Sequence, residues 1–234
     1  MKLLKSFLFG LALISAFAAT DALADSTHKA FETRVAVTAS VLDQHAKMEG
    51  GGQSSDWQHA PDVMAGINST ISFGYRWRYV GLYFDEELGG LWWTGDTKKI
   101  AKDGVFFGGS YVTVRPLIGI KKKIEIDFAV GVGMMYSAAS KSSSSGDDNY
   151  EDYQDYSNDS SVSTKLIANK DGDSVPCFAI KVGVGFTYYV MKNFGLGVNF
   201  DYNLGIHVVS YDGGISHTTL FHHMNPGLHA NIQF

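Results

Sequence analysis

Asn225-Pro-Gly-Leu-His-Ala-Asn-Ile-Gln-Phe234 is the stretch that decides the fold. Within it, the apolar residues Leu228, Ala230 and Ile232 alternate with polar residues, and the stretch finishes on the aromatic Phe234. Successive side chains of a β-strand point to opposite faces, so such a strand has one apolar face and one polar face. A strand that closes a membrane barrel needs this division, because it faces lipid on one side and a polar lumen on the other.

The N-terminal segment has the pattern of an export signal. Two lysines precede an apolar run from Phe7 to about Ala19, and Ala22-Leu-Ala24 fits the small-residue rule for cleavage. The run is shorter than the roughly 20 residues that a membrane-spanning helix needs, which disfavours a permanent anchor. We therefore predict a signal peptide over residues 1–24 and a mature chain over residues 25–234.

The composition argues for strands rather than membrane helices. Aromatic residues make up 13% of the chain, and there are 26 glycines but only 4 prolines. After the N-terminal run, no stretch approaches the roughly 18 uninterrupted apolar residues of a spanning helix. The single cysteine, Cys177, excludes an intramolecular disulfide, and the net charge of −5 argues against nucleic acid as a partner.

Eight segments of the chain alternate apolar and polar residues, and the connections between them alternate in length. The segments begin near residues 33, 63, 80, 105, 124, 178, 196 and 221. Long loops are expected at about 43–62, 94–104, 137–175 and 211–220, and tight turns separate the other pairs. This order predicts an all-β fold, an eight-stranded antiparallel up-and-down transmembrane β-barrel with short periplasmic turns and long extracellular loops.

The alternative fold is a soluble secreted sandwich or a lipocalin-like barrel, which would place its apolar residues inside. Here one face of each segment is bulky and apolar, whereas the other collects glycine, hydroxyl residues and nearly all the charges. In the segment that begins at 124, for example, Ile126 and Phe128 alternate with Glu125 and Asp127. A small and charged face suits the inside of a narrow barrel, and a bulky apolar face suits lipid.

Charged residues of mixed sign are expected to line the lumen. They are the cations Arg34, Arg115 and Lys181 and the anions Asp85, Glu87, Glu125, Asp127 and Asp201. Isolated buried charges are costly, so these residues should pair in a hydrogen-bonded network, with Arg115 and Glu125 as neighbours near one turn. An eight-stranded lumen is just wide enough for side chains to fill it, which predicts a polar plug. A narrow path for ions or small solutes is the alternative.

Aromatic residues near the strand ends predict two girdles at the level of the lipid headgroups. The expected surface girdle contains Trp92, Trp93 and Tyr136, and the expected periplasmic girdle contains Tyr75, Trp77, Tyr79, Tyr188, Tyr189 and Phe234. Glu86 falls on the lipid-facing side of its segment. Either it lies near the outer interface or a β-bulge shifts the register there.

Catalysis and metal binding have little support in the sequence. No His-x-Ser pair exists, and His207 and Ser210 fall on opposite faces of a strand, so nucleophile and base do not converge. The histidines of the C-terminal region lack the spacing of a metal site, and we expect polar barrel residues instead. They are His207, His217, His222, His223 and His229. We therefore expect no enzyme, no cofactor and no metal.

The longest expected loop, 137–175, has a low-complexity acidic composition. A run of serines at 142–145 is followed by acidic residues interleaved with Tyr150, Tyr153 and Tyr156. Such a segment has too few apolar residues to bury a core. Its tyrosines could contact a partner, since aromatic rings anchor interfaces at low entropy cost. The alternative is a solvated loop that only shields the surface.

Over nearly all of residues 25–234, the chain resembles the small outer-membrane barrels typified by the OmpA transmembrane domain, OmpX and the opacity-type surface antigens. The resemblance rests on the signal peptide, the eight alternating segments, the loop lengths and the terminal aromatic. The C-terminal set Leu228, Ala230, Ile232 and Phe234 resembles the signature that the barrel-assembly machinery reads. The resemblance implies a place in the Gram-negative outer membrane, among its lipid and lipopolysaccharide, with the loops on the cell surface.

The resemblance also implies a class of function. It implies a non-enzymatic surface protein that contributes to envelope integrity, or to adhesion and host interaction through a cell-surface ligand bound by its extracellular loops. A narrow porin for small solutes is the alternative hypothesis. A lipid A-modifying enzyme of the outer membrane is the third and the least favoured.

Overall fold

The computed structural model describes residues 30–50, 53–60, 62–77, 79–95, 104–120, 123–139, 176–211 and 214–234. The long strands are β1 (Ala30–Gly50), β4 (Met64–Arg76), β5 (Val80–Trp93), β6 (Val105–Ile120), β7 (Ile124–Ala139), β8 (Cys177–Tyr189), β9 (Phe194–Tyr211) and β10 (Ile215–Gln233). Two short strands, β2 (Gln53–Ser54) and β3 (Gln58–His59), follow β1. The described residues contain no helix with the length and hydropathy that crossing a membrane requires.

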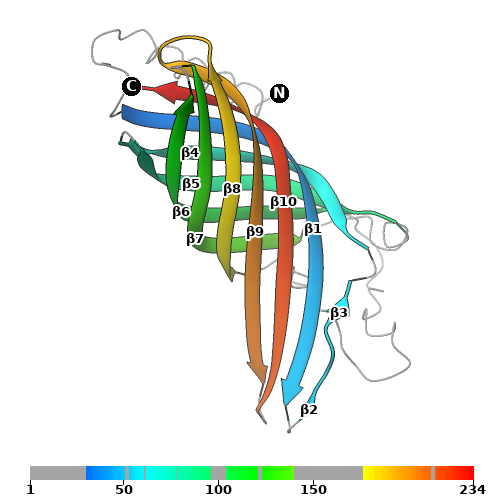
Figure 1. Ribbon diagram of the computed structural model, residues 1–234. Helices are drawn as coiled ribbons and strands as arrows, with labels where there is room; N and C mark the ends of the chain where they lie inside the picture. Colours follow the sequence, from blue (N-terminus) through cyan, green and yellow to red (C-terminus); the bar gives the residue numbers. More distant parts are fainter. Residues whose placement is uncertain are drawn as a thin grey trace.

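The eight long strands form one closed antiparallel sheet. Each pairs with the next long strand along the chain, and β1 pairs with β10, so the sheet closes on itself (Figure 1). The start of β1 meets the end of β10, where the Phe234 N–H donates to the Phe31 carbonyl at 2.9 Å. The predicted all-β, eight-stranded up-and-down barrel is confirmed.

Each strand separates a charged interior from an apolar exterior. In β7, Asp127 is 1% exposed whereas its neighbour Phe128 is 44% exposed, and in β8 Lys181 is 0% exposed whereas Val182 is 43% exposed. Burial of apolar surface away from water stabilises a soluble protein, so this arrangement is unfavourable in water and favourable in lipid. The soluble sandwich and the lipocalin-like barrel both require the reverse arrangement and are excluded.

Two prolines interrupt the hydrogen-bonded ladder without shifting the register. Pairing of β1 with β10 is missing between Thr38↔Gly227 and Val41↔Met224, opposite Pro226. Pairing of β6 with β7 is likewise missing between Val114↔Val130 and Leu117↔Asp127, at Pro116. Proline has no N–H to donate, so a closed barrel loses one or two ladder positions at each proline and then resumes.

Strands β1, β9 and β10 continue beyond the others at one end of the barrel. This end lies opposite the one where β1 begins and β10 ends. Pairing of β4 with β1 stops at Leu42↔Met64, whereas pairing of β10 with β1 continues to Glu49↔Ser216. Strands β2 and β3 cover the edge of β1 that β4 leaves open (Figure 1). We call this extension the projecting sheet: residues 43–50 of β1, 207–211 of β9 and 215–222 of β10, with β2 and β3.

The projecting sheet corrects two of the expected loop boundaries. The loop expected over 43–62 is strand as far as Gly50, and much of the loop expected over 211–220 is the beginning of β10. Both stretches are rich in polar and charged residues, which is why they resembled loops. The ladder between β1 and β10 supplies backbone hydrogen bonds that polar side chains do not disturb.

Glu86 needs no bulge to account for its position. It keeps the regular register, opposite Ile71 on β4 and Ser110 on β6. On the outer face its carboxylate accepts hydrogen bonds from the Ser110 hydroxyl at 2.6 Å and from the Tyr136 hydroxyl at 2.9 Å. Two hydroxyl donors thus satisfy an acid on a face that is otherwise apolar.

Two of the expected girdle residues point into the barrel instead. Trp93 is 6% exposed and packs in the lumen, whereas its neighbour Trp92 is 50% exposed. Similarly, the Tyr189 hydroxyl bonds to lumen side chains, whereas Tyr188 is exposed. Placing both members of each pair in a girdle was wrong, because consecutive residues of a strand face opposite sides.

Candidate functional site in the barrel lumen

Charged side chains from four strands meet in the middle of the lumen, and we call this group the central cluster: Asp85, Glu87, Arg115, Lys181 and Asp201. The Arg115 guanidinium donates to both oxygens of Asp85, at 2.8 and 2.9 Å. Lys181 Nζ donates to Glu87 Oε1 at 2.7 Å and lies 3.3 Å from Asp85 Oδ2 and 3.8 Å from Asp201 Oδ2. Lys181 Nζ thus lies within 4 Å of three carboxylates, one of which also pairs with Arg115, so it is the electrostatic centre of the cluster.

Neutral side chains complete the central cluster. The Thr113 hydroxyl and the Asn203 amide donate to Asp85 and Glu87 respectively, each at 2.9 Å. Aromatic rings cover the two cations, since the Arg115 guanidinium lies 4.5 Å from the ring centre of Tyr83 and Lys181 Nζ lies 5.1 Å from that of Tyr111. Cation–π contacts of this kind help to compensate buried charges for lost water.

A second ion pair crosses the barrel closer to the end where β1 begins. Arg34 on β1 donates two parallel hydrogen bonds to Asp127 on β7, at 3.0 and 2.8 Å, and a third to Asn231 at 2.8 Å. β1 and β7 are not neighbours in the sheet, so this pair spans the lumen. Bidentate arginine–carboxylate pairs are strong and hold a fixed geometry, which makes this pair a brace across the barrel.

A third cluster lies at the same end and includes two residues that the sequence analysis missed. Arg76 donates to Glu32 at 3.1 Å and to Glu125 at 2.5 Å, and the Tyr189 hydroxyl joins them. The signal was present, because Arg76 continues the inward alternation of its strand and Glu32 precedes Arg34 by two residues. The expected contact between Arg115 and Glu125 was wrong: the structure pairs Arg115 with Asp85 and Glu125 with Arg76.

An apolar layer fills the lumen on the other side of the central cluster, toward the projecting sheet. Its members are buried apolar side chains that replace polar ones where the strands approach this end. They are Leu42, Met64, Leu91, Trp93, Val105, Phe107, Tyr111, Met135, Cys177, Ala179 and Phe221. His223 lies between the two layers, with its ring centre 4.4 Å from that of Phe107. The plug is therefore polar through the middle, as expected, but apolar at one end, which differs from the expected polar plug.

The eight predicted lumen charges therefore all have partners in the interior. Seven of them are no more than 5% exposed, and the side chain of Asp201 is 13% exposed. Some buried polar atoms of the lumen have no protein partner, among them Arg115 Nε and Nη1 and both amide atoms of Asn68. Such atoms mark places where water can enter the plug.

The other predicted residues lie away from the lumen. Leu228, Ala230 and Ile232 of the C-terminal signature alternate with the buried residues of β10, and Leu228 is 68% exposed on the outer face. Tyr150, Tyr153 and Tyr156 lie outside the residues that the structure describes, as does the expected signal peptide.

The described residues combine a closed ring of eight antiparallel strands with an apolar exterior and a charged interior. The chain has the architecture of a small bacterial outer-membrane barrel. No protein-family model matches its sequence, and no curated protein is similar to it in sequence. The assignment of the architecture therefore rests on the strand topology and on the distribution of charge between the two faces.

Several solved structures of low sequence identity are similar to this chain over most of its length. Neisserial surface protein A is 11% identical with a TM-score of 0.46, and the match covers 87% of this chain and 97% of that one. OprG of Pseudomonas aeruginosa is 8% identical with a TM-score of 0.44, over 89% and 99% of the two chains. The outer-membrane protease OmpT of Escherichia coli is 8% identical with a TM-score of 0.38, over 92% and 100%.

Proposed function

We propose that this protein is a non-enzymatic outer-membrane barrel that acts at the cell surface through its extracellular loops, in adhesion or in maintaining the envelope. One observation carries the proposal: the lumen is filled by ion pairs and then by an apolar layer, so the barrel is a scaffold and not a conduit. A rigid barrel leaves the long loops as the part that is free to meet partners.

The proposal includes an orientation and a route of assembly. The short turns and the ends of β1 and β10 face the periplasm, and the projecting sheet and long loops face outward, among lipopolysaccharide. Residues 1–24 direct export, and Leu228, Ala230, Ile232 and Phe234 are read by the barrel-assembly machinery. The exposure of Leu228 and Phe234, 68% and 40%, supports this reading, since these side chains lie on the outside of the barrel.

Conductance across a planar lipid bilayer tests the closed lumen. The refolded protein is expected to give no discrete current steps, because among the described strands buried apolar side chains fill the lumen next to the central cluster. A known porin prepared in the same detergent serves as the positive control for insertion. Reproducible single-channel steps from the refolded protein would contradict the scaffold function.

Such current steps would favour a narrow channel, the second candidate. The unpartnered polar atoms around Arg115 and Asn68 favour it, since water that reaches them could form part of a path. The interior carboxylates Glu32, Asp85, Glu87, Glu125, Asp127 and Asp201 outnumber the cations Arg34, Arg76, Arg115 and Lys181. A channel of this composition would therefore select cations over anions.

Deletion of residues 142–173 tests the role of the acidic loop. The barrel is expected to fold as before, because the deleted segment lies outside the paired strands β7 and β8. Cells that display the deletion should adhere less to a monolayer of cultured epithelial cells than cells that display the wild type. A triple Tyr150→Ala, Tyr153→Ala, Tyr156→Ala variant should reproduce most of the loss, since it keeps the acidic charge. Undiminished adherence of the deletion would reject the loop as the contact site.

A further inference from the structure

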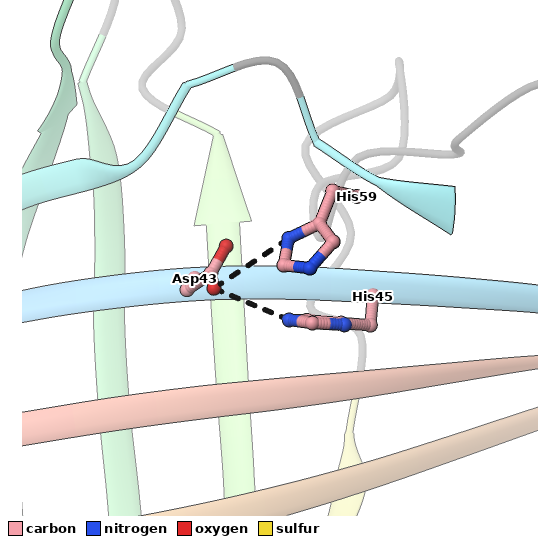
Figure 2. Close-up of side chains that lie close together, drawn as sticks. All are labelled: Asp43, His45 and His59. Atoms are coloured by element: carbon pink, nitrogen blue, oxygen red, sulfur yellow. Dashed lines mark hydrogen bonds and ion pairs between the residues drawn. The ribbon is translucent and has the colours of Figure 1, made fainter. Parts of the chain in front are cut away.

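An aspartate and two histidines lie together on the outer face of the projecting sheet (Figure 2). Asp43 and His45 are alternate residues of β1, so their side chains point to the same side. His59 on β3 lies directly opposite His45 in the antiparallel register. In Figure 2 dashed lines join the Asp43 carboxylate to one ring nitrogen of His45 and to one ring nitrogen of His59.

Backbone hydrogen bonds hold β3 in place beside β1. The Ala60 N–H donates to the Gln44 carbonyl at 3.0 Å, and the Ser55 N–H donates to the Met48 carbonyl at 2.9 Å. His59 therefore belongs to a strand that is attached to the barrel wall before any ligand arrives. β4 begins at Met64, opposite Leu42, so it leaves the edge of β1 beyond Leu42 open. β3 occupies part of this edge.

The three side chains already have nearly the spacing of metal ligands. Asp43 Oδ2 lies 3.2 Å from His45 Nε2 and 3.8 Å from His59 Nδ1, and the three ligand atoms all lie within 4.8 Å of one another. Ligands about 2.0–2.1 Å from a tetrahedral zinc ion are separated from each other by roughly 3.3–3.4 Å. A small side-chain adjustment is therefore enough to place one ion among the three atoms.

The chemistry of the donors selects the class of metal. Two imidazole nitrogens with one carboxylate oxygen suit zinc and other first-row transition ions. Calcium and magnesium prefer sets made of oxygen alone, and two neutral nitrogens supply neither the charge nor the number of ligands that they need. We propose that Asp43, His45 and His59 form a surface binding site for a divalent transition-metal ion such as Zn²⁺, with the fourth coordination position open to solvent.

A fourth polar group flanks the site without completing it. His222 on β10 lies opposite Asp43 in the register, and its ring centre is 4.8 Å from that of His45. Its Nδ1 is 2.6 Å from the Tyr202 hydroxyl, which holds the ring against β9. His222 therefore stabilises the position of His45 by ring contact, and we assign it a positioning role.

Metal binding would connect β3 to the barrel wall through side chains as well as through the backbone. Because an ion that binds only the native arrangement stabilises it, local opening of β3 becomes rarer when the site is occupied. The amide hydrogen of Ala60 reports this opening, since it donates to the Gln44 carbonyl of β1 directly after β3. This proposal does not depend on adhesion or on a closed lumen.

The test uses untagged, chelator-treated protein refolded in detergent and titrated with Zn²⁺ in a calorimeter. One equivalent of Zn²⁺ is expected to bind, and Ca²⁺ and Mg²⁺ should give no heat of binding. Titration with Co²⁺ should give the visible absorption of a four-coordinate site rather than that of the hydrated ion. Hydrogen exchange at Ala60 should slow when Zn²⁺ is added. Absence of saturable one-to-one Zn²⁺ binding would mean that the three residues form only a hydrogen-bonded surface cluster, which overturns the proposal.

Substitutions then identify the ligands. His45→Ala and His59→Ala should each weaken Zn²⁺ binding by more than about 100-fold, and His222→Ala by about tenfold, the lower end for a residue that positions a ligand. His207→Ala is the matched control, because His207 is a partly exposed histidine of the same projecting sheet, and its Nδ1 lies 3.2 Å from the Pro176 carbonyl oxygen.

The gel shift that marks the folded barrel shows whether each variant is native, so a lost site is not mistaken for a lost fold. Zn²⁺ binding that survives both His45→Ala and His59→Ala would overturn the assignment, as would a loss at His207 equal to that at His59. An effect at His222 as large as that at His59 would overturn the three-residue ligand set.

Discussion

Lys181→Met is expected to destabilise the barrel by about 3–5 kcal/mol, since removal of one partner from a buried ion cluster leaves uncompensated charge. Lys181 is fully buried and lies within 4 Å of Asp85, Glu87 and Asp201. Methionine has a similar volume, so the substitution removes the charge without opening a large cavity. Unfolding by urea in detergent micelles, followed by tryptophan fluorescence and by gel mobility, measures the change.

Two further variants separate electrostatics from packing. Adding Glu87→Gln to Lys181→Met should recover part of the lost stability, because one of the stranded carboxylates becomes neutral and keeps hydrogen-bonding groups. Lys47→Met on the projecting sheet is the control, since the Lys47–Glu49 pair is solvent-exposed and should contribute less than about 1 kcal/mol. If Lys181→Met costs no more than Lys47→Met, the central cluster does not stabilise the barrel.

Val130→Arg is expected to destabilise the barrel in lipid vesicles by about 2–4 kcal/mol, the cost of a cation at the middle of the hydrocarbon layer. Val130 is 57% exposed on the outer face and lies midway along β7, between Ile124 and the girdle residue Tyr136. The reason for the large effect is the absence of water at that depth. Urea titration of folding into vesicles measures the free energy directly.

The same substitution near a strand end provides the control for depth. Ile118 is 52% exposed on β6, close to the short turn that leads to β7. Ile118→Arg should cost only about 0–1 kcal/mol, because the side chain can reach the headgroup region. Equal and small costs at both positions would show that water surrounds the barrel, and the membrane location would have to be abandoned.

The two predictions concern opposite faces of one wall. Lys181 and Val182 are consecutive residues, yet one is fully buried among carboxylates and the other is exposed to the outside. A barrel with this wall is stable only where the outside is apolar and the inside holds its own counterions. The plug and the membrane are thus complementary requirements of the same alternating sequence.

The network in the lumen was only partly predictable from the sequence. Alternation placed Arg34 and Asp127 on the inner face, but it did not pair them. They come from strands that are not neighbours in the sheet, so their contact depends on the width and stagger of the barrel. The error over Arg115 and Glu125 has the same origin, since closeness to one turn does not decide which level of the lumen a side chain occupies.

The site on the projecting sheet was missed for a related reason. Most histidines of the sequence lie in the C-terminal region, whereas the cluster combines His45 and His59 with Asp43, in a stretch that was expected to be loop. Their proximity depends on β3 pairing with β1, and two-residue strands leave no periodic signal in a sequence.

The sequence by itself determined the strands, their two faces and the up-and-down order, because a period of two is a local property that each segment displays without its neighbours. Only the tertiary structure decided which charges pair across the lumen, where the apolar layer begins and how Asp43, His45 and His59 meet. Those contacts depend on the relative stagger of strands and on which edge remains open, and these are properties of the closed sheet as a whole.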